Sequence, residues 1–310
     1  MTAERSEQPV SPVAPLLLPS TTVDGHVHST FSDDAVSSVD ENLAAAVATG
    51  LTSVTFVDHV RSSTAWVPEM VATVRALSVA EGLEVRCGVE TKLLDVAGRL
   101  DLPTDAVVGR GALDVVLVGD HQFPGTDGPW SPTQTRERIA DGLSPADAVS
   151  LLVEASIAAM TSQPGIQLAH WFSILPKVGL DESDLSDEHL RAWAAAARET
   201  GSTIEVNEKW ACPGPRAVRA ALDAGARLVV ATDSHDARDV GRYVRVPSIL
   251  EAAVSGETLP AETWSAETLP AETLSAETLP AETLPAEPLP ATEPSAVPSH
   301  QTPGTAGPRA

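Results

Sequence analysis

The segment Thr21-Thr22-Val23-Asp24-Gly25-His26-Val27-His28 is the first copy of a pattern that recurs along most of the chain. Its β-branched start predicts a short strand. Residues two apart in a strand point the same way, so His26 and His28 can present both imidazoles to one point. Imidazole is the commonest metal-binding side chain, which makes this pair a candidate start to a metal site. An isolated His-x-His pair is more often a surface or hydrogen-bonded core pair, so the interpretation depends on the rest of the chain.

The same pattern, a short apolar run that ends in polar residues and leads into a helix-like segment, occurs seven times. Some runs, such as 114–119, are continuously apolar, which is typical of strands buried on both faces. Strands that alternate with helices predict an α/β fold with a parallel sheet and right-handed crossovers. Seven units indicate a closed or nearly closed barrel. An open doubly wound sheet is the alternative, but its Gly-rich dinucleotide fingerprint is missing. The predicted strands are 23–28, 54–59, 85–91, 115–121, 166–171, 204–208 and 228–235.

Several of the intervening segments carry helix signals. Ser38 and Glu41 form a capping-box pattern ahead of an apolar segment that Gly50 is placed to end. Pro145, after Ser144, occupies a first-turn position of a helical run that continues to Met160. Two further helices are predicted at 187–200 and 215–224, each followed by a glycine.

The two ends of the chain differ in composition from the middle. Residues 1–20 are polar and punctuated by proline, which predicts a disordered leader. From residue 256 to 310 a Glu/Pro/Thr/Ala-rich pentapeptide recurs. A period of five fits neither a helix nor a strand, so this segment is predicted to be a disordered acidic tail without a catalytic role. The barrel is therefore expected to occupy residues 21–255.

Composition limits the partners and the compartment. The formal net charge of −23 argues against a nucleic-acid-binding surface, because phosphate backbones are bound by Lys and Arg. The chain has only two cysteines, too few for a disulfide framework, which favours a reducing compartment. No window is apolar enough to cross a membrane and no convincing signal peptide is present. We expect a cytoplasmic protein, and the sequence leaves its oligomeric state open.

Histidines and carboxylates gather at the ends of the predicted strands. In a parallel β/α barrel those ends converge on one face, where active sites are built. Taken singly, each of these residues could be a core or salt-bridge residue, but six histidines in register with the strands indicate a shared site. The histidines are His26, His28, His59, His121, His170 and His235, and the accompanying acids are Asp24, Asp58, Glu90, Asp120 and Asp233.

In their order along the chain, these motifs resemble the polymerase and histidinol phosphatase (PHP) family. The resemblance covers residues 22–245. The motifs are DGHVHSTFSD at 24–33, VDH at 57–59, GVE at 88–90, DVVLVGDH at 114–121, LAH at 168–170, IEVN at 204–207 and ATDSH at 231–235. The resemblance implies a distorted (β/α)7 TIM-like barrel, which agrees with the seven units counted from the sequence.

The resemblance also implies three divalent metal ions, either Zn, Mn or Fe. A donor set of nitrogens and oxygens without thiolate does not separate these metals. Glu90 would bridge the first and second ions, and Asp34 could replace Asp33 as a ligand of the third. Glu90, Asp233 and His235 would be the catalytic residues. The implied ligands are His26, His28, Glu90 and Asp233 for the first ion, Glu90, His121 and His170 for the second, and Asp33, His59 and His235 for the third.

This resemblance implies a phosphatase that hydrolyses a small phosphomonoester with a metal-activated water. Cations next to the predicted site could bind the phosphate, although each could equally be an ordinary surface charge. A PHP-type nuclease or exonuclease is one alternative, against which the acidic composition argues. A non-enzymatic, metal-bound interaction module is another, against which the complete ligand set argues. The candidate substrate-binding residues are Arg61, Lys92, Asn207, Lys209 and Arg238.

Overall fold

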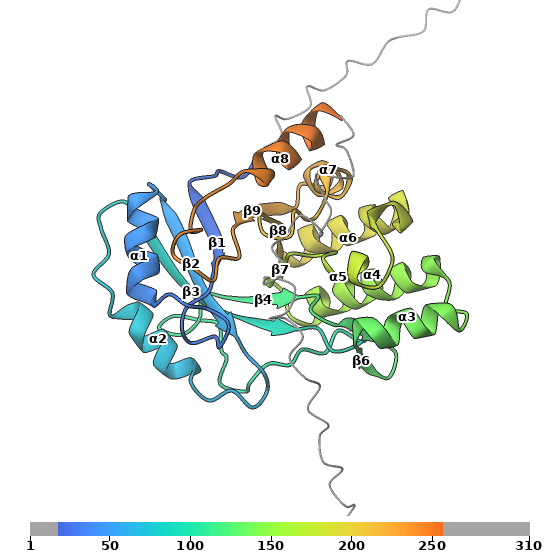
Figure 1. The fold of residues 1–310 in the computed structure, drawn as a ribbon, viewed down its shortest axis with the longest axis horizontal. Helices are drawn as coiled ribbons and strands as arrows, with labels where there is room; N and C mark the ends of the chain where they lie inside the picture. The colour runs from blue at the N-terminus through green and yellow to red at the C-terminus, as the bar shows by residue number, and fades with distance from the viewer. Residues whose placement is uncertain (1–17, 257–310) are drawn as a thin grey trace, which may run out of the picture. The chain divides into compact units, whose positions relative to one another are not determined.

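A seven-stranded parallel sheet forms the centre of the computed structural model, which describes residues 18–256 (Figure 1). Its strand order is β1-β2-β3-β4-β7-β8-β9, so every strand lies next to its neighbour in the chain except where a small hairpin intervenes between β4 and β7. The strands are β1 (Val23–Val27), β2 (Ser53–His59), β3 (Glu84–Lys92), β4 (Val115–Gly119), β7 (Gln167–Ala169), β8 (Thr203–Asn207) and β9 (Arg227–Ala231).

The first strand and the segment after the last strand lie together and nearly close the sheet into a barrel. A parallel bridge joins Val27 to Ser234, and the amide of His28 donates to the Ser234 carbonyl at 2.9 Å. The Asp24 carboxylate accepts hydrogen bonds from the amide of Thr232 at 3.0 Å and from its hydroxyl at 2.6 Å. The Asp24 side chain thus joins the two ends of the sheet, where the other neighbouring strands are joined by continuous backbone hydrogen bonds.

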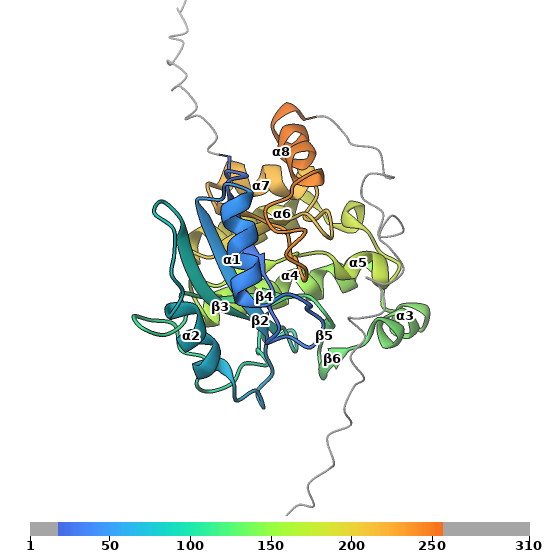
Figure 2. The ribbon, with the colours of Figure 1, turned by 60° about the vertical axis from the view of Figure 1, so that its left-hand side comes forward.

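Helices cover the outside of the barrel, as Figures 1 and 2 show. The capping box of Ser38 and Glu41 is present, and the helix it begins ends just before Gly50. The helices at 187–200 and 215–224 have the predicted bounds, and each ends in a glycine with positive φ. The elements are α1 (Val39–Ala48), α2 (Val67–Arg75), α3 (Pro132–Ala140), α4 (Pro145–Ser162), α5 (Ile174–Lys177), η1 (Glu182–Asp184), α6 (Asp187–Thr200), α7 (Pro215–Ala224) and α8 (Arg245–Ser255).

The apolar residues of each strand divide between two sides. Phe56, Val116 and Leu168 belong to the large buried cluster that includes residues of the surrounding helices. Leu117 and Val57 belong to a separate small cluster of strand residues. Continuous apolar strands therefore serve both the helix-facing layer and the barrel interior, as parallel sheets require.

These observations confirm the predicted α/β barrel of seven units. The sequence did not predict the antiparallel hairpin of β5 (Phe123–Gly125) and β6 (Gly128–Trp130). The predicted leader at 1–20, apart from its last three residues, and the predicted tail at 256–310, apart from Gly256, lie outside the described residues. Among the helices within 18–256, none combines the length and the apolar character needed to span a membrane.

Candidate metal centre

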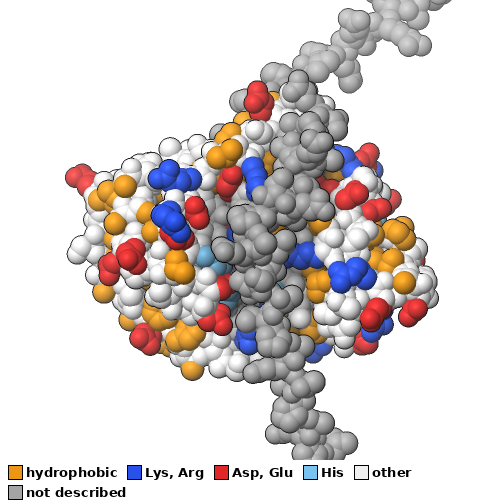
Figure 3. Space-filling model, in the orientation of Figure 1, with side chains coloured by type: hydrophobic (Ala, Val, Ile, Leu, Met, Phe, Trp, Pro, Cys, Tyr) orange, Lys and Arg blue, Asp and Glu red, His pale blue; other side chains and the backbone are white. Residues whose placement is uncertain are grey.

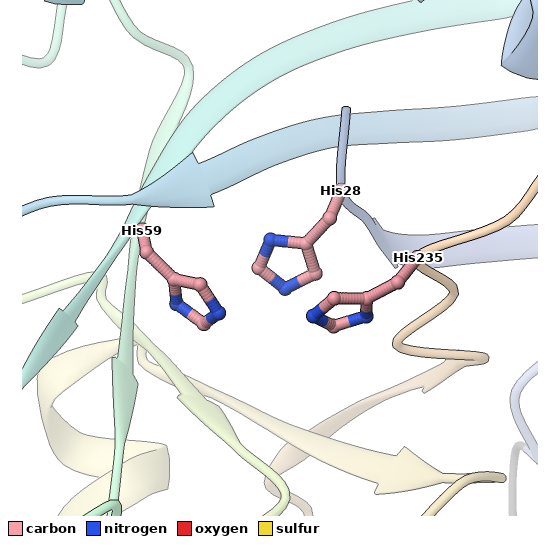
Figure 4. Close-up of side chains that lie close together, drawn as sticks. All are labelled: His28, His59 and His235. Carbon is pink, nitrogen blue, oxygen red and sulfur yellow. The ribbon is translucent and has the colours of Figure 1, made fainter. Parts of the chain in front are cut away.

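The six strand-end histidines lie together at the carboxyl ends of the strands. Figure 4 shows His28, His59 and His235, which follow or end three different strands, with their rings around one space. The ring centroid of His28 lies 4.3 Å from that of His59 and 4.2 Å from that of His235. Residues separated by up to 209 positions in sequence (235 − 26) thus share one site, as the strand-end pattern predicted.

The first group of candidate ligands combines β1 with the ends of β3 and β9. The Nε2 atoms of His26 and His28 are 2.8 Å apart. Asp233 Oδ1 lies 3.7 Å from the first of these nitrogens and 3.3 Å from the second. Glu90 Oε2 lies 3.4 Å and 3.3 Å from the same two nitrogens. These four residues are the ones that the family resemblance implies for the first ion.

The second group gathers around the other oxygen of Glu90. Its Oε1 atom lies 2.9 Å from Nε2 of His121 and 2.9 Å from Nε2 of His170. The two carboxylate oxygens of one residue thus face two different sets of histidine nitrogens. This division is the geometry expected of a bridging carboxylate.

The third group contains Asp34 in place of Asp33. Asp34 Oδ2 lies 3.3 Å from Nε2 of His59 and 3.2 Å from Nε2 of His235. Asp33 is exposed to solvent, and no ion pair within residues 18–256 joins it to the histidines. Of the two aspartates that the sequence left open, Asp34 is the one that faces these histidines, because the loop after β1 turns the second aspartate of the pair toward them.

The donor atoms of these groups suit divalent cations. Glu90 Oε2 and His235 Nε2 are buried and have no hydrogen-bond partner. Each nevertheless lies close to a charged or polar group, Glu90 Oε2 to the ring of His59 and His235 Nε2 to the carboxylate of Asp34. Buried polar atoms without partners are costly, and a cation bound between them would remove that cost. Imidazole nitrogens and carboxylate oxygens are ligands for zinc, manganese and iron. Three overlapping sets of side chains place their donor atoms within 4.8 Å of one another: His26, His28 and Asp233; His28, His59 and His235; and His59, Glu90 and His121.

Charge within the cluster shifts the pKa values of its members. Burial raises the pKa of Glu90, but His121 and His26 outweigh it and hold that pKa well below its usual range. Burial, together with His235 and His59, lowers the pKa of His28 to about 3. The carboxylates act in the opposite direction on other imidazoles: although burial lowers the pKa of His59, Glu90 and Asp34 raise it to about 10. Binding a metal would therefore release protons from such histidines, because an imidazole is a ligand only when it is neutral.

Glu205 orients the ligand nitrogen of His26. This carboxylate is fully buried, and its Oε2 lies 3.1 Å from His26 Nδ1. It also accepts hydrogen bonds from Gln167 Nε2 and Asn207 Nδ2, both at 2.7 Å. With Nδ1 of His26 donating to Glu205, Nε2 keeps its lone pair for the metal side. The sequence contained Glu205 within the IEVN motif, but no spacing marked it as an orienting residue.

Asp58 and Asp120 have comparable roles on other strands. Asp58 accepts hydrogen bonds from the Ser29 and Ser32 amides at 2.8 and 3.1 Å, and Ser32 Oγ lies 3.3 Å from His28 Nδ1. Asp120 Oδ1 lies 3.3 Å from Nδ1 of His170. These acids hold loops and imidazoles in place rather than facing the centre of the site.

Backbone shape also matters at two candidate ligands and one glycine. His170 and Asp233 have φ values of 34° and 55°, in the left-handed region that non-glycine residues rarely adopt. At Gly119 an added Cβ would lie 2.6 Å from His121 Nε2 and 2.7 Å from Glu90 Oε1. The absence of a side chain at Gly119 thus leaves room for the ligand atoms of the second group.

The predicted substrate-binding residues separate into two sets. Lys209 Nζ lies 3.5 Å from His235 Nδ1, Arg61 lies two residues after His59 at the end of β2, and Lys92 is the last residue of β3, two residues after Glu90. Asn207 is fully buried, and its amide donates to Glu205 and accepts from the Trp210 amide, so it serves the protein interior instead of a substrate. The Arg238 side chain is 87% exposed and pairs with Asp236 at 2.6 Å, away from the ligand groups.

Trp210 and Lys177 are neighbours of the site that the sequence did not single out. Trp210 Nε1 donates to Asp233 Oδ2 at 2.9 Å. Lys177 Nζ lies 4.0 Å from the centroid of the Trp210 ring, within range of a cation–π interaction. A tryptophan directly after Lys209 was the available signal, but its contact with Asp233 depends on the loop after β8.

Comparisons with known proteins identify the family of the chain. A family model described as "PHP domain" matches residues 24–209. A protein of Shewanella sp. strain MR-4 named "probable phosphatase" is 27% identical over 243 residues, covering 74% of this chain and 82% of the relative. One of the same name from Caldanaerobacter subterraneus subsp. tengcongensis is 25% identical over 258 residues, covering 78% of this chain and 87% of the relative.

A solved structure resembles the fold. It is histidinol phosphate phosphatase from Lactococcus lactis subsp. lactis, complexed with zinc, L-histidinol and phosphate. The TM-score is 0.52 at 15% sequence identity, and the alignment covers 74% of this chain and 93% of the other. At this identity the likeness supports the barrel architecture alone.

Proposed function

Because the chain belongs to the PHP domain family, we propose that it is a metal-dependent phosphatase that hydrolyses a small phosphomonoester. The observation that carries the proposal is Glu90, whose two oxygens face separate groups of histidine nitrogens. Two relatives are named probable phosphatases, which supports the same reaction class.

We assign the site three divalent ions, either Zn, Mn or Fe. Bound there, such ions lower the pKa of a water, orient phosphate oxygens and stabilise charge in the transition state. Glu90 bridges two ligand groups, Asp233 completes the first and His235 completes the third, so these three residues are the proposed catalytic set. The proposed metal ligands are His26, His28, Asp34, His59, Glu90, His121, His170, Asp233 and His235.

Lys209 gives the site a positive charge of its own. Its Nζ lies 3.8 Å from Asp233 Oδ2 and 3.5 Å from His235 Nδ1, so the ammonium group borders the first and third ligand groups. A phosphoryl oxygen placed there would accept a charge-assisted hydrogen bond. The Trp210 indole, which donates to the same oxygen of Asp233, keeps that carboxylate oriented toward the histidines.

Elemental analysis and kinetics together test this function. We expect purified protein to contain close to three equivalents of metal and to hydrolyse an aryl phosphomonoester, with activity lost in chelator and restored by Zn or Mn. A phosphodiester serves as the control substrate. Hydrolysis of the diester alone would favour the nuclease alternative, and metal binding without hydrolysis of either ester would favour the non-enzymatic module.

The remaining assignments stay predictions. Residues 21–255 are proposed as the catalytic unit, with the segment after them dispensable for turnover. The cytoplasmic location is supported by the two cysteines, which are both buried and unpaired. A small phosphorylated molecule is the proposed partner, and no nucleic acid is expected.

A further inference from the structure

The lysines of this acidic protein gather at the carboxyl ends of the strands. The chain has a net charge of −23 and only three lysines, Lys92, Lys177 and Lys209, and all three are half-buried. Lysine is ordinarily among the most exposed residues. Figure 3 shows basic side chains around the centre of the face on which histidine atoms are visible. Lys92 ends β3, Lys209 lies 3.5 Å from His235 Nδ1, and Lys177 lies over the ring of Trp210, so all three are neighbours of the site.

Arg61 and Lys92 form a second cationic pair beside the histidines. In the β2–β3 register His59 pairs with Glu90, and the Val60 amide donates to the Glu90 carbonyl at 2.8 Å. Continuing this register by two residues places Arg61 opposite Lys92. Lys92 lies two residues after Glu90 on the same strand, so its side chain leaves the same face of the sheet.

The pair borders the second ligand group. Lys92 is paired in register with Gly119, the residue whose added Cβ would touch Glu90 Oε1 and His121 Nε2. Neighbouring strands lie about 4.8 Å apart. The aliphatic part of the Lys92 side chain therefore lies next to the ligands, two residues beyond Glu90 toward the carboxyl end of β3.

Like charges side by side are unfavourable without an anion. Within residues 18–256 neither Arg61 nor Lys92 has an ion pair within 4 Å. Asp101 lies beside the pair, because its amide donates to the Lys92 carbonyl at 3.0 Å, but its carboxylate forms no ion pair with either cation and its Oδ1 accepts a hydrogen bond from the Ser62 amide at 2.8 Å. An anionic group bound between the two cations would offset their repulsion.

We propose that Arg61 and Lys92 bind a second anionic group of the substrate, so that the preferred phosphomonoester also carries another phosphate or a carboxylate. This inference rests on the proposed phosphatase function. Lys209 follows β8, and β4 and β7 lie between β8 and β3 in the sheet order. Lys209 and the Arg61–Lys92 pair therefore stand on different sides of the ligand groups. A substrate with two separated anions reaches both.

A matched set of three-carbon substrates tests the inference. The set is propyl phosphate, the phosphate ester of 3-hydroxypropanoate and 1,3-propanediol bisphosphate. We expect kcat/KM for the better of the two doubly anionic esters to exceed that for propyl phosphate by about 10- to 100-fold, the factor that one or two charge-assisted hydrogen bonds supply. The comparison between the second and third substrates identifies whether the second group is carboxylate or phosphate.

Variants locate the preference. Lys92→Met and Arg61→Gln should lower kcat/KM for the preferred ester at least about tenfold more than for propyl phosphate, mainly through KM. Arg191→Ala, at an exposed position of α6, is the control and should change neither value. Calorimetry with propylphosphonate and 1,3-propanediyl bisphosphonate gives a readout that needs no turnover: Lys92→Met should weaken binding of the bisphosphonate more.

Three outcomes are distinguishable. Equal kcat/KM for all three esters in the wild type would overturn this inference and leave the phosphatase function standing. An equal loss for every ester in Lys92→Met and Arg61→Gln would also overturn it, because the pair would then act on the scissile phosphate or on Glu90. If no ester is hydrolysed by metal-loaded protein, the proposed function itself fails.

Discussion

Two sets of buried carboxylates occupy the strand ends of this barrel, and they differ in what their oxygens face. Asp24 and Asp58 are fully buried and accept hydrogen bonds from backbone amides and hydroxyls of neighbouring loops. Glu90 and Asp233 are almost as deeply buried, yet Glu90 faces histidine nitrogens at both oxygens. All four are deeply buried acids, and the partners of their oxygens are what separates the two sets.

The difference separates structural acids from candidate ligands. Burial raises the pKa values of Asp24 and Asp58 to about 6, because neutral donors only partly offset it. For Asp233 burial acts in the same direction, but Lys209 and His26 outweigh it and hold its pKa well below the usual range. Asp24 and Asp58 have amide and hydroxyl donors at their oxygens, whereas Glu90 and Asp233 depend on neighbouring positive charge, which a bound metal ion would supply.

The largest effect should come from removing the bridging charge. Glu90→Gln keeps the size of the side chain but replaces one ligand oxygen with an amide nitrogen that cannot coordinate. With less negative charge between the first and second ions, at least one of them should be lost and the rate should fall by orders of magnitude. Elemental analysis beside aryl phosphate kinetics measures both effects.

Asp58→Asn is the matched control for that variant. It also turns a buried strand-end carboxylate into an amide, but one whose oxygens are used by Ser29 and Ser32. We expect it to retain the wild-type number of ions. A full complement of metal in Glu90→Gln would show that Glu90 does not bridge.

Adjacent aspartates allow a sharper test at the third group. Asp34→Ala should remove one equivalent of metal with a smaller loss of rate than Glu90→Gln, because only the third group loses an oxygen. Asp33→Ala, one residue away and exposed, should keep all ions and the full rate. The reverse result would return the assignment to Asp33.

An orienting acid should matter less than a ligand. Glu205→Ala removes the acceptor that holds His26 Nδ1, and metal affinity should weaken about 10- to 100-fold, as is typical for the hydrogen-bond partners of ligands. Glu205→Gln retains one acceptor oxygen and should recover part of the affinity. Titration of metal-free protein with Zn measures this. Equal affinity in wild type and Glu205→Ala would mean that the barrel alone fixes the ring.

The space at Gly119 gives a further comparison between ligand and core positions. Gly119→Ala would place its Cβ against His121 and Glu90, whereas Gly88→Ala would meet Val115 and Val57. Both variants should be less stable in thermal melts. Only Gly119→Ala should lose metal at a temperature where it is folded, and equal metal loss in the two would contradict the specific role of Gly119.

The sequence could predict the barrel because its signals are periodic and local. Seven apolar runs alternate with helix-like segments, and α6 and α7 end at glycines whose φ is positive in the structure. The β5–β6 hairpin lacks such a signal: Gly125 lies against the Trp130 ring, and each strand has only three residues. Its formation depends on a contact that no periodicity records.

The site could be predicted less fully for a related reason. Strand ends converge by topology, so the six histidines could be placed together from their spacing alone. Asp33 and Asp34 lie in an irregular loop where no period decides which carboxylate turns inward. Asn207 could not be told from a substrate contact, because both its partners, Glu205 and Trp210, come from the fold.

The smallest effect concerns Glu182, a half-buried acid of η1 that lies outside the ligand groups. Its Oε1 accepts a hydrogen bond from the Gly214 amide at 2.6 Å, so it resembles the structural acids in its partner. Burial raises its pKa from 4.5 to about 7, although the Gly214 amide and Arg216 act in the opposite direction. The folded state therefore holds this proton more tightly than the unfolded chain does. The contribution of Glu182 to the free energy of unfolding should therefore be fully present below pH 4.5 and should be lost as pH rises through 7.

Glu182→Gln cannot lose that proton, so it should gain stability relative to wild type between pH 5 and pH 8, by an amount that grows through the interval. Urea unfolding of both proteins in chelator, at several pH values, measures the difference without a contribution from metal binding. Glu188→Gln, at an exposed position in the first turn of α6, is the control and should give a difference independent of pH over this range. A constant difference for Glu182→Gln as well would mean that a single backbone donor is enough to keep a buried carboxylate ionised. Acids that accept hydrogen bonds from amides would then be ionised like those that face histidines. The two sets would differ only in whether their oxygens have hydrogen-bond donors, and not in charge.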